Sequence, residues 1–150
     1  MTKAVVVERR IKARPETIFS FFTDPERWLQ WQGVEGSVEP RPGGILRINV
    51  MGATFASGHV VEVDPPWRIV FTWGWEGADS DVPPGSSTVE ITLTDEGGVT
   101  VVRLTHRDLP DSTTDLHRIG WENYLGRLAV VAIGGDPGPD PFRAAAPTWS

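Results

Sequence analysis

The N-terminal quarter of the chain changes from strand-like to helix-like spacing of its hydrophobic residues. Residues 4–12, AVVVERRIK, are rich in β-branched side chains and predict a first strand. In the stretch that follows, Ile18, Phe19 and Phe22 share one face of a helix. Pro15 suits the first position of that helix, because proline has no N–H to leave unpaired there.

A second short helix and a run of strands come next. Asp24 before Pro25 is an N-cap pair, which predicts a helix to about Trp31. After the turn RPGG, apolar and polar residues alternate as in half-buried strands. Strands are expected over residues 44–50, 55–64 and 67–76, followed by a hairpin over 87–109 whose turn is DEGG.

The C-terminal part contains one long amphipathic helix, with Ser112 as its expected N-cap and an end near Ile133. Its apolar face comprises His117, Trp121, Tyr124, Leu125, Leu128, Val131 and Ala132. Gly120 lies at the edge of that face and Gly126 on the polar side. Each glycine costs roughly 1 kcal/mol relative to alanine within a helix, so Gly120 indicates either a close backbone approach or a space left open.

The strands present matching apolar faces, which are expected to lie under this helix. The inward sets are Val89, Ile91 and Leu93; Val102, Leu104 and His106; His59, Val61 and Val63; and Ile69, Phe71, Trp73 and Trp75. Helices segregated from an antiparallel sheet make an α+β domain. One domain is expected over residues 1–134, and the Pro/Gly-rich residues 135–150 are expected to form a mobile tail unless something docks it.

Composition excludes several functions. A net charge of −6 argues against non-specific nucleic-acid binding, and the absence of cysteine excludes disulfides, thiolate metal sites and cysteine nucleophiles. No segment reads as a secretory signal or a membrane span, so a cytoplasmic protein is expected, and the preference for arginine over lysine hints at a bacterial source. The chain contains seven tryptophans, an unusually large number for its length.

All three histidines are predicted to point inward, and three interpretations stay open for them. Each histidine is either hydrogen-bonded within the core, part of the polar lining of a ligand pocket, or a zinc ligand. His59, His106 and His117 come from separate elements without HxH or HxxxH spacing. For that reason neither a metal nor a cofactor is predicted.

Five segments in the same order resemble the activator of heat-shock-protein-90 ATPase homologue-like family of the START/SRPBCC (birch-pollen-allergen-like) superfamily. They are ARPETIFSFFTDPERWLQW, RPGGILRI, GHVVEVDPPWRIVFTWGW, VEITLTDEGGVTVVRLTHRDL and HRIGWENYLGRL, within residues 4–134. The resemblance implies a helix-grip fold, in which a curved antiparallel sheet of about six strands wraps the C-terminal helix. Two short helices follow the first strand.

Such domains commonly hold an apolar cavity between sheet and helix. The expected pocket residues are His59, Val61, Phe71, Trp73, Val102, Leu104, His106, His117, Trp121, Tyr124, Leu125 and Leu128. The first hypothesis is therefore binding of a small hydrophobic or aromatic ligand. The alternatives are a cyclase, dehydratase or hydrolase with histidine as acid or base, and a chaperone-associated or regulatory interaction domain. No catalytic signature is present, no membrane partner is expected, and a monomer or a homodimer is possible.

Overall fold

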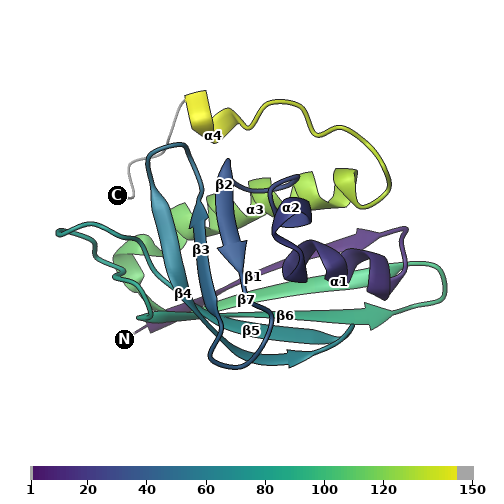
Figure 1. Ribbon diagram of the computed structural model, residues 1–150, viewed down its shortest axis with the longest axis horizontal. Coiled ribbons are helices and arrows are strands. Elements are labelled where there is room, and N and C mark those ends of the chain that lie inside the picture. The colour runs from purple at the N-terminus through teal and green to yellow at the C-terminus, as the bar shows by residue number, and fades with distance from the viewer. Residues whose placement is uncertain (1, 145–150) are drawn as a thin grey trace.

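The computed structural model describes residues 2–144 and shows an α+β fold in which a curved antiparallel sheet holds the long helix α3 (Figure 1). The sheet has seven strands in the order β1-β7-β6-β5-β4-β3-β2. The strands are β1 (Thr2–Ile11), β2 (Glu35–Val38), β3 (Ile45–Asn49), β4 (Phe55–Asp64), β5 (Arg68–Trp73), β6 (Ser87–Asp95) and β7 (Thr100–Pro110). The helices are α1 (Pro15–Thr23), α2 (Pro25–Trp28), a short 3-10 helix Asp111–Thr113, α3 (Thr114–Val131) and α4 (Pro141–Ala144).

The two short helices predicted after the first strand close one end of the sheet, and the second ends at Trp28, earlier than predicted. Proline begins each of them, and the Asp24 side chain accepts the Glu26 backbone N–H at 2.9 Å, which confirms it as the N-cap of α2. Trp28 and Trp31 stack with ring centroids 5.3 Å apart, and both are fully buried. Their aromatic cluster fixes the α1–α2 end of the core.

The hairpin formed by β6 and β7 confirms the alternation predicted for it. Val89 pairs with His106, and Ile91 pairs with Leu104, so their side chains line the same face of the sheet. All four residues are fully buried. This face is the floor on which α3 packs.

The orientation predicted for β4 is wrong at His59 and Val61, whereas Val63 packs against the core as predicted. Val60 is fully buried, whereas His59 is exposed and Val61 is 48% exposed on the outer face. The pairing with β5 shifts between Val60 and Glu62, and such an irregularity changes which residues of a strand face inward. On the outer face, the His59 side chain contacts Thr72 instead, and His59 Nδ1 lies 3.2 Å from Thr72 Oγ1.

Two further expectations are corrected. The sheet has an additional strand, β2, whose residues show no alternation, since Val38 is the one buried residue among its four. Ser112 is not the N-cap of the long helix, because a 3-10 turn precedes it and no side chain caps it. The hydroxyl groups of Thr113 and Thr114 instead donate back to the carbonyls of Pro110 and Asp111.

Helix α3 buries the face predicted from its periodicity. The buried residues include His117, Gly120, Trp121, Tyr124, Leu125, Leu128 and Val131. The segment after α3 runs along the side of the helix away from β1 and β7 (Figure 1), which leaves α3 between the sheet and the C-terminal segment. The described part of the predicted tail is thus docked, and residues 145–150 of that tail lie outside the described residues.

Candidate functional site

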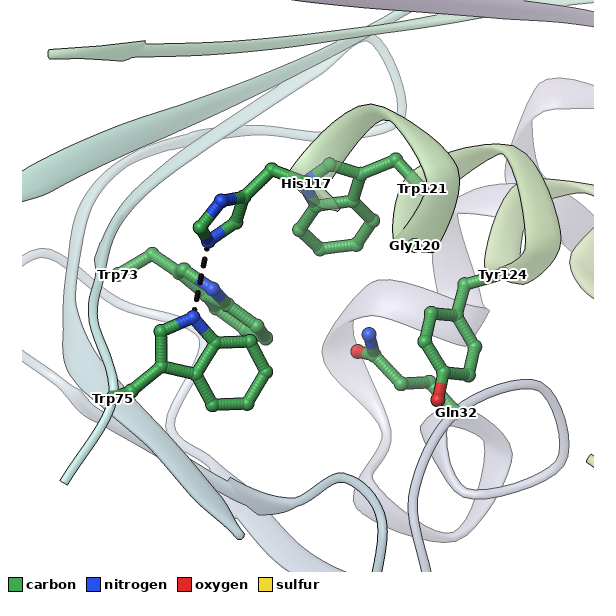
Figure 2. A pocket seen from close by; sticks show the side chains of 7 residues that line it. All are labelled: Gln32, Trp73, Trp75, His117, Gly120, Trp121 and Tyr124. Atoms are coloured by element: carbon green, nitrogen blue, oxygen red, sulfur yellow. Dashed lines mark hydrogen bonds between the residues drawn. The ribbon is translucent and has the colours of Figure 1, made fainter. Parts of the chain in front are cut away.

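A small cavity lies beneath α3, at the end of β5. Its volume is about 10 Å³, which is about the room that a single water molecule needs. Figure 2 shows tryptophan and histidine side chains on one side and Tyr124 with Gln32 on the other. The lining residues are Gln32, Trp73, Trp75, His117, Gly120, Trp121 and Tyr124. Aromatic rings therefore fill most of the predicted hollow, and the space is smaller than expected.

His106 is fixed by hydrogen bonds on both ring nitrogens. Trp121 Nε1 donates to His106 Nδ1 at 2.9 Å, and because an indole N–H can only donate, Nδ1 carries no proton. The proton of the neutral ring is therefore on Nε2, which donates to Ser87 Oγ at 2.8 Å. The Ser87 hydroxyl in turn donates to the Trp73 backbone carbonyl at 2.6 Å. These bonds specify one tautomer of His106 and tie α3 to the sheet.

His117 is held in the opposite tautomer. Trp75 Nε1 donates to His117 Nε2 at 3.0 Å (Figure 2), so this nitrogen is unprotonated. Nδ1 carries the proton and donates to the Thr113 carbonyl, 2.7 Å away. The rings of His106 and His117 meet edge to face with centroids 5.1 Å apart. Both histidines thus belong to a buried network in which each is neutral.

The surroundings of both histidines oppose protonation. Burial lowers the pKa of His106 well below its ordinary value of 6.5, and the neighbouring His117 lowers it further. Burial also lowers the pKa of His117, against a smaller raising effect of the Thr113 carbonyl. Protonating either ring would place a hydrogen on the nitrogen that accepts a tryptophan N–H. That hydrogen bond would then be lost. The core interpretation of these two histidines therefore fits the geometry better than a general acid or base.

The predicted pocket residues fall into three groups. Trp73, His117, Trp121 and Tyr124 line the cavity. Phe71, Val102, Leu104, His106, Leu125 and Leu128 are buried around it without lining it. His59 and Val61 lie on the outer face of the sheet, so their predicted inward orientation is wrong.

Two lining side chains were missing from the predicted pocket. Trp75 shares the alternation of Phe71 and Trp73, which was the signal that could have placed it at the cavity. Gln32 lies just beyond α2 and is 3% exposed. Nothing in the local pattern distinguishes it from a surface glutamine.

Two N–H groups of cavity-lining residues have no acceptor among the described residues, and of the two only that of Trp73 is fully buried. Trp73 Nε1 is buried without a hydrogen-bond partner. Gln32 Oε1 accepts from Trp28 Nε1 at 3.0 Å, which assigns the other amide position to the nitrogen. Among the described contacts, this Nε2 has no acceptor. Buried polar groups are rarely left unpaired, so the Trp73 indole N–H marks a place of chemical interest.

The C-terminal segment reaches the cavity through Tyr124. The Tyr124 hydroxyl donates to Asp140 Oδ2 at 2.7 Å, and the Phe142 ring lies edge-on to the Tyr124 ring at 6.0 Å. Arg127 holds the same segment through the Gly138 carbonyl, 3.0 Å away. Burial and the carboxylate of Asp140 raise the pKa of Tyr124 above its ordinary value of 10.0. The phenol therefore stays a hydrogen-bond donor.

Removing this contact is expected to loosen the C-terminal segment at a modest cost in stability. The change Tyr124→Phe should lower the free energy of unfolding by about 1–3 kcal/mol, because the Asp140 carboxylate loses a charge-assisted partner. Urea unfolding of Tyr124→Phe, Asp140→Ala and the double variant measures the coupling between the two side chains. Coupling near zero would contradict the assigned bond.

Neither a metal site nor a spanning helix is found in residues 2–144. No group of three or more His, Cys, Asp or Glu residues there is placed to hold a metal ion. No helix in that range has both the length and the apolar character needed to cross a bilayer.

Comparison with known proteins places the chain in a family. Residues 12–132 match the family described as "Activator of Hsp90 ATPase homolog 1-like protein". The solution structure of an AHSA1-like protein from Rhizobium etli is 48% identical, with a TM-score of 0.74 over 95% of this chain and 89% of that chain. Curated proteins give no match.

Two other solved structures share the fold. DynU16, a protein in the dynemicin biosynthetic locus, is 26% identical, with a TM-score of 0.77 over 89% of this chain and 48% of that chain. The Aha1 dimer from Colwellia psychrerythraea is 19% identical, with a TM-score of 0.75 over 89% of this chain and 98% of that chain, and so shows the fold alone. The match over residues 12–132 and the helix-grip architecture agree with the resemblance seen in the sequence. The chain therefore belongs to the activator of Hsp90 ATPase homolog 1-like family, within the SRPBCC superfamily.

Proposed function

We propose that the chain binds a small hydrophobic or aromatic molecule beneath α3. The observation that carries this proposal is the cavity itself, a point between sheet and helix where the rings of Trp73, Trp75 and Trp121 leave the core incompletely filled. Protein interiors are ordinarily packed as densely as organic crystals. The gap itself has room for about one water molecule, so its indole walls offer a flat apolar molecule a large contact area only after part of the wall has moved.

A guest larger than water requires part of the wall to move. Trp75, His117 and Trp121 are held by hydrogen bonds within the network that joins α3 to the sheet. Tyr124, in contrast, is held through its hydroxyl only by Asp140 of the short C-terminal segment. The side of the cavity formed by Tyr124 is therefore the side that yields when a molecule enters.

The enzyme alternative loses support from the geometry of its histidines. His106 and His117 have both ring nitrogens bonded within the protein, and their pKa values are lowered by burial. His59, the third candidate, lies on the outer face, away from the cavity. The chaperone-associated alternative has no described contact that favours it over ligand binding.

A matched pair of glycine substitutions on α3 tests whether binding takes place in the cavity. Gly120 lines the cavity, so Gly120→Leu is expected to fill it and to weaken binding of indane, a small bicyclic hydrocarbon, at least about tenfold by calorimetry. Gly126→Leu makes the same change where an added Cβ meets open space, and it should leave indane binding unaltered.

Circular dichroism of both variants separates lost binding from lost folding. If Gly120→Leu does not fold, the smaller change Gly120→Ala takes its place in the same comparison. Equal loss in both variants, or no loss in either, would contradict a site beneath α3. Failure of the unmodified chain to bind either indane or the corresponding ketone, 1-indanone, would contradict the proposed function itself.

A further inference from the structure

The polar atoms on the cavity wall are unequally divided between donors and acceptors. Two acceptors of the lining residues already receive one hydrogen bond each, because Gln32 Oε1 accepts from Trp28 and His117 Nε2 accepts from Trp75. The donor Trp73 Nε1 belongs to a residue of the same wall and is buried with no acceptor among the described residues. The Gln32 amide is seen at the edge of the enclosed space, opposite the tryptophans (Figure 2).

We propose that the ligand carries a neutral hydrogen-bond acceptor, such as a ketone, quinone or amide carbonyl, on a flat apolar frame, and that Trp73 Nε1 donates to it. This inference rests on the proposed function and narrows its ligand class. An indole N–H has no acceptor role, so a guest that occupies the cavity satisfies it only by offering an oxygen or nitrogen lone pair. A pure hydrocarbon would leave the Trp73 N–H buried and unpaired, which costs binding free energy.

The charges near the cavity favour a neutral acceptor over an anion. No lysine or arginine is among the seven lining residues. The carboxylate of Asp140 lies against Tyr124, one of the seven, and it repels negative charge. Burying an unpaired carboxylate is far more costly than burying a carbonyl. The site therefore selects a carbonyl compound over the corresponding acid.

Indane and 1-indanone test this inference, since the ketone adds one acceptor oxygen to the same bicyclic frame. The ketone is the less hydrophobic of the two, so the hydrophobic effect alone favours indane. We expect calorimetry to show 1-indanone binding about tenfold more tightly than indane, the size of one buried hydrogen bond. Indane-1-carboxylate is expected to bind more weakly than either.

The substitution Trp73→Phe keeps an aromatic ring at the same position, removes the N–H donor and makes the ring smaller. It should reduce the preference for 1-indanone over indane to within about twofold. Trp67→Phe makes the same change at a residue that is 45% exposed and does not line the cavity, and it should retain the full preference.

A spectroscopic readout on the unmodified chain keeps the inference testable even if Trp73→Phe does not fold. In a ¹H–¹⁵N NMR spectrum the Trp73 indole proton should move downfield with 1-indanone and not with indane. Equal affinities for both compounds, or a Trp73 indole proton indifferent to the ketone, would overturn the acceptor proposal while leaving ligand binding intact. Failure of both compounds to bind would overturn the proposed function and this inference together.

Discussion

Replacing Trp121 with alanine is expected to lower the free energy of unfolding by about 3–5 kcal/mol. The Trp121 ring is 3% exposed and packs against Trp73 with centroids 5.2 Å apart. Its loss removes buried apolar area, leaves a void, and deprives His106 Nδ1 of its indole donor. These three effects act on one position at the junction of α3 and the sheet. Chemical denaturation followed by circular dichroism measures the change.

The same variant also enlarges the space beneath α3. Added indole should therefore bind to Trp121→Ala and restore part of the lost stability, since an apolar cavity of side-chain size accepts small aromatic molecules. Trp67→Ala is the matched control, because Trp67 is exposed at the turn between β4 and β5 and its loss should cost less than about 1 kcal/mol. A similar cost for the two variants would contradict the packing described for Trp121.

Acidification is expected to destabilise the protein between pH 6.5 and pH 5. The pKa values of His106 and His117 are lowered in the folded state from the ordinary 6.5, so in this range the unfolded chain binds more protons than the folded one. Falling pH therefore favours unfolding, with a limit of roughly 1.4 kcal/mol per pH unit for each histidine that stays neutral in the fold. Above pH 6.5 the contribution of the two histidines fades, because the unfolded chain also loses these protons.

Urea unfolding at a series of pH values measures this slope. His117→Gln keeps an acceptor for Trp75 but cannot titrate, so it should remove about half of the slope. His59→Gln changes an exposed histidine and should leave the slope as it is. Stability that stays constant from pH 7 to pH 5 would contradict the description of two neutral buried imidazoles.

The sequence pattern predicted the fold and the buried face of α3 better than it predicted the face of β4. The 3.6-residue spacing of His117, Trp121, Tyr124, Leu125 and Leu128 identifies a single buried face of the helix, because arginine, glutamate and asparagine occupy the opposite side. In β4, Val60 and Val61 are identical neighbours, so alternation cannot choose between the two faces. The irregular pairing after Val60 is a tertiary feature with no local signal.

The candidate site could be predicted only in outline. The aromatic character of its wall follows from the positions of Trp73, Trp121 and Tyr124 on inward faces. Its volume does not, because the space left by several large rings depends on their rotamers. Gln32 is brought to the wall by the turn after α2, and the partner of Tyr124 comes from the segment expected to be mobile. Contacts between segments that are distant in the sequence depend on tertiary packing, and a local sequence pattern does not encode them.

The most direct test of ligand binding beneath α3 is an experimental structure of the chain with 1-indanone. We expect the ketone to lie between Trp73 and α3, with Tyr124 displaced from Asp140. The hydrogen bonds of His106 and His117 should be unchanged. A ketone bound on the outer surface, or a cavity that stays closed around Trp73 at saturating ketone, would contradict it.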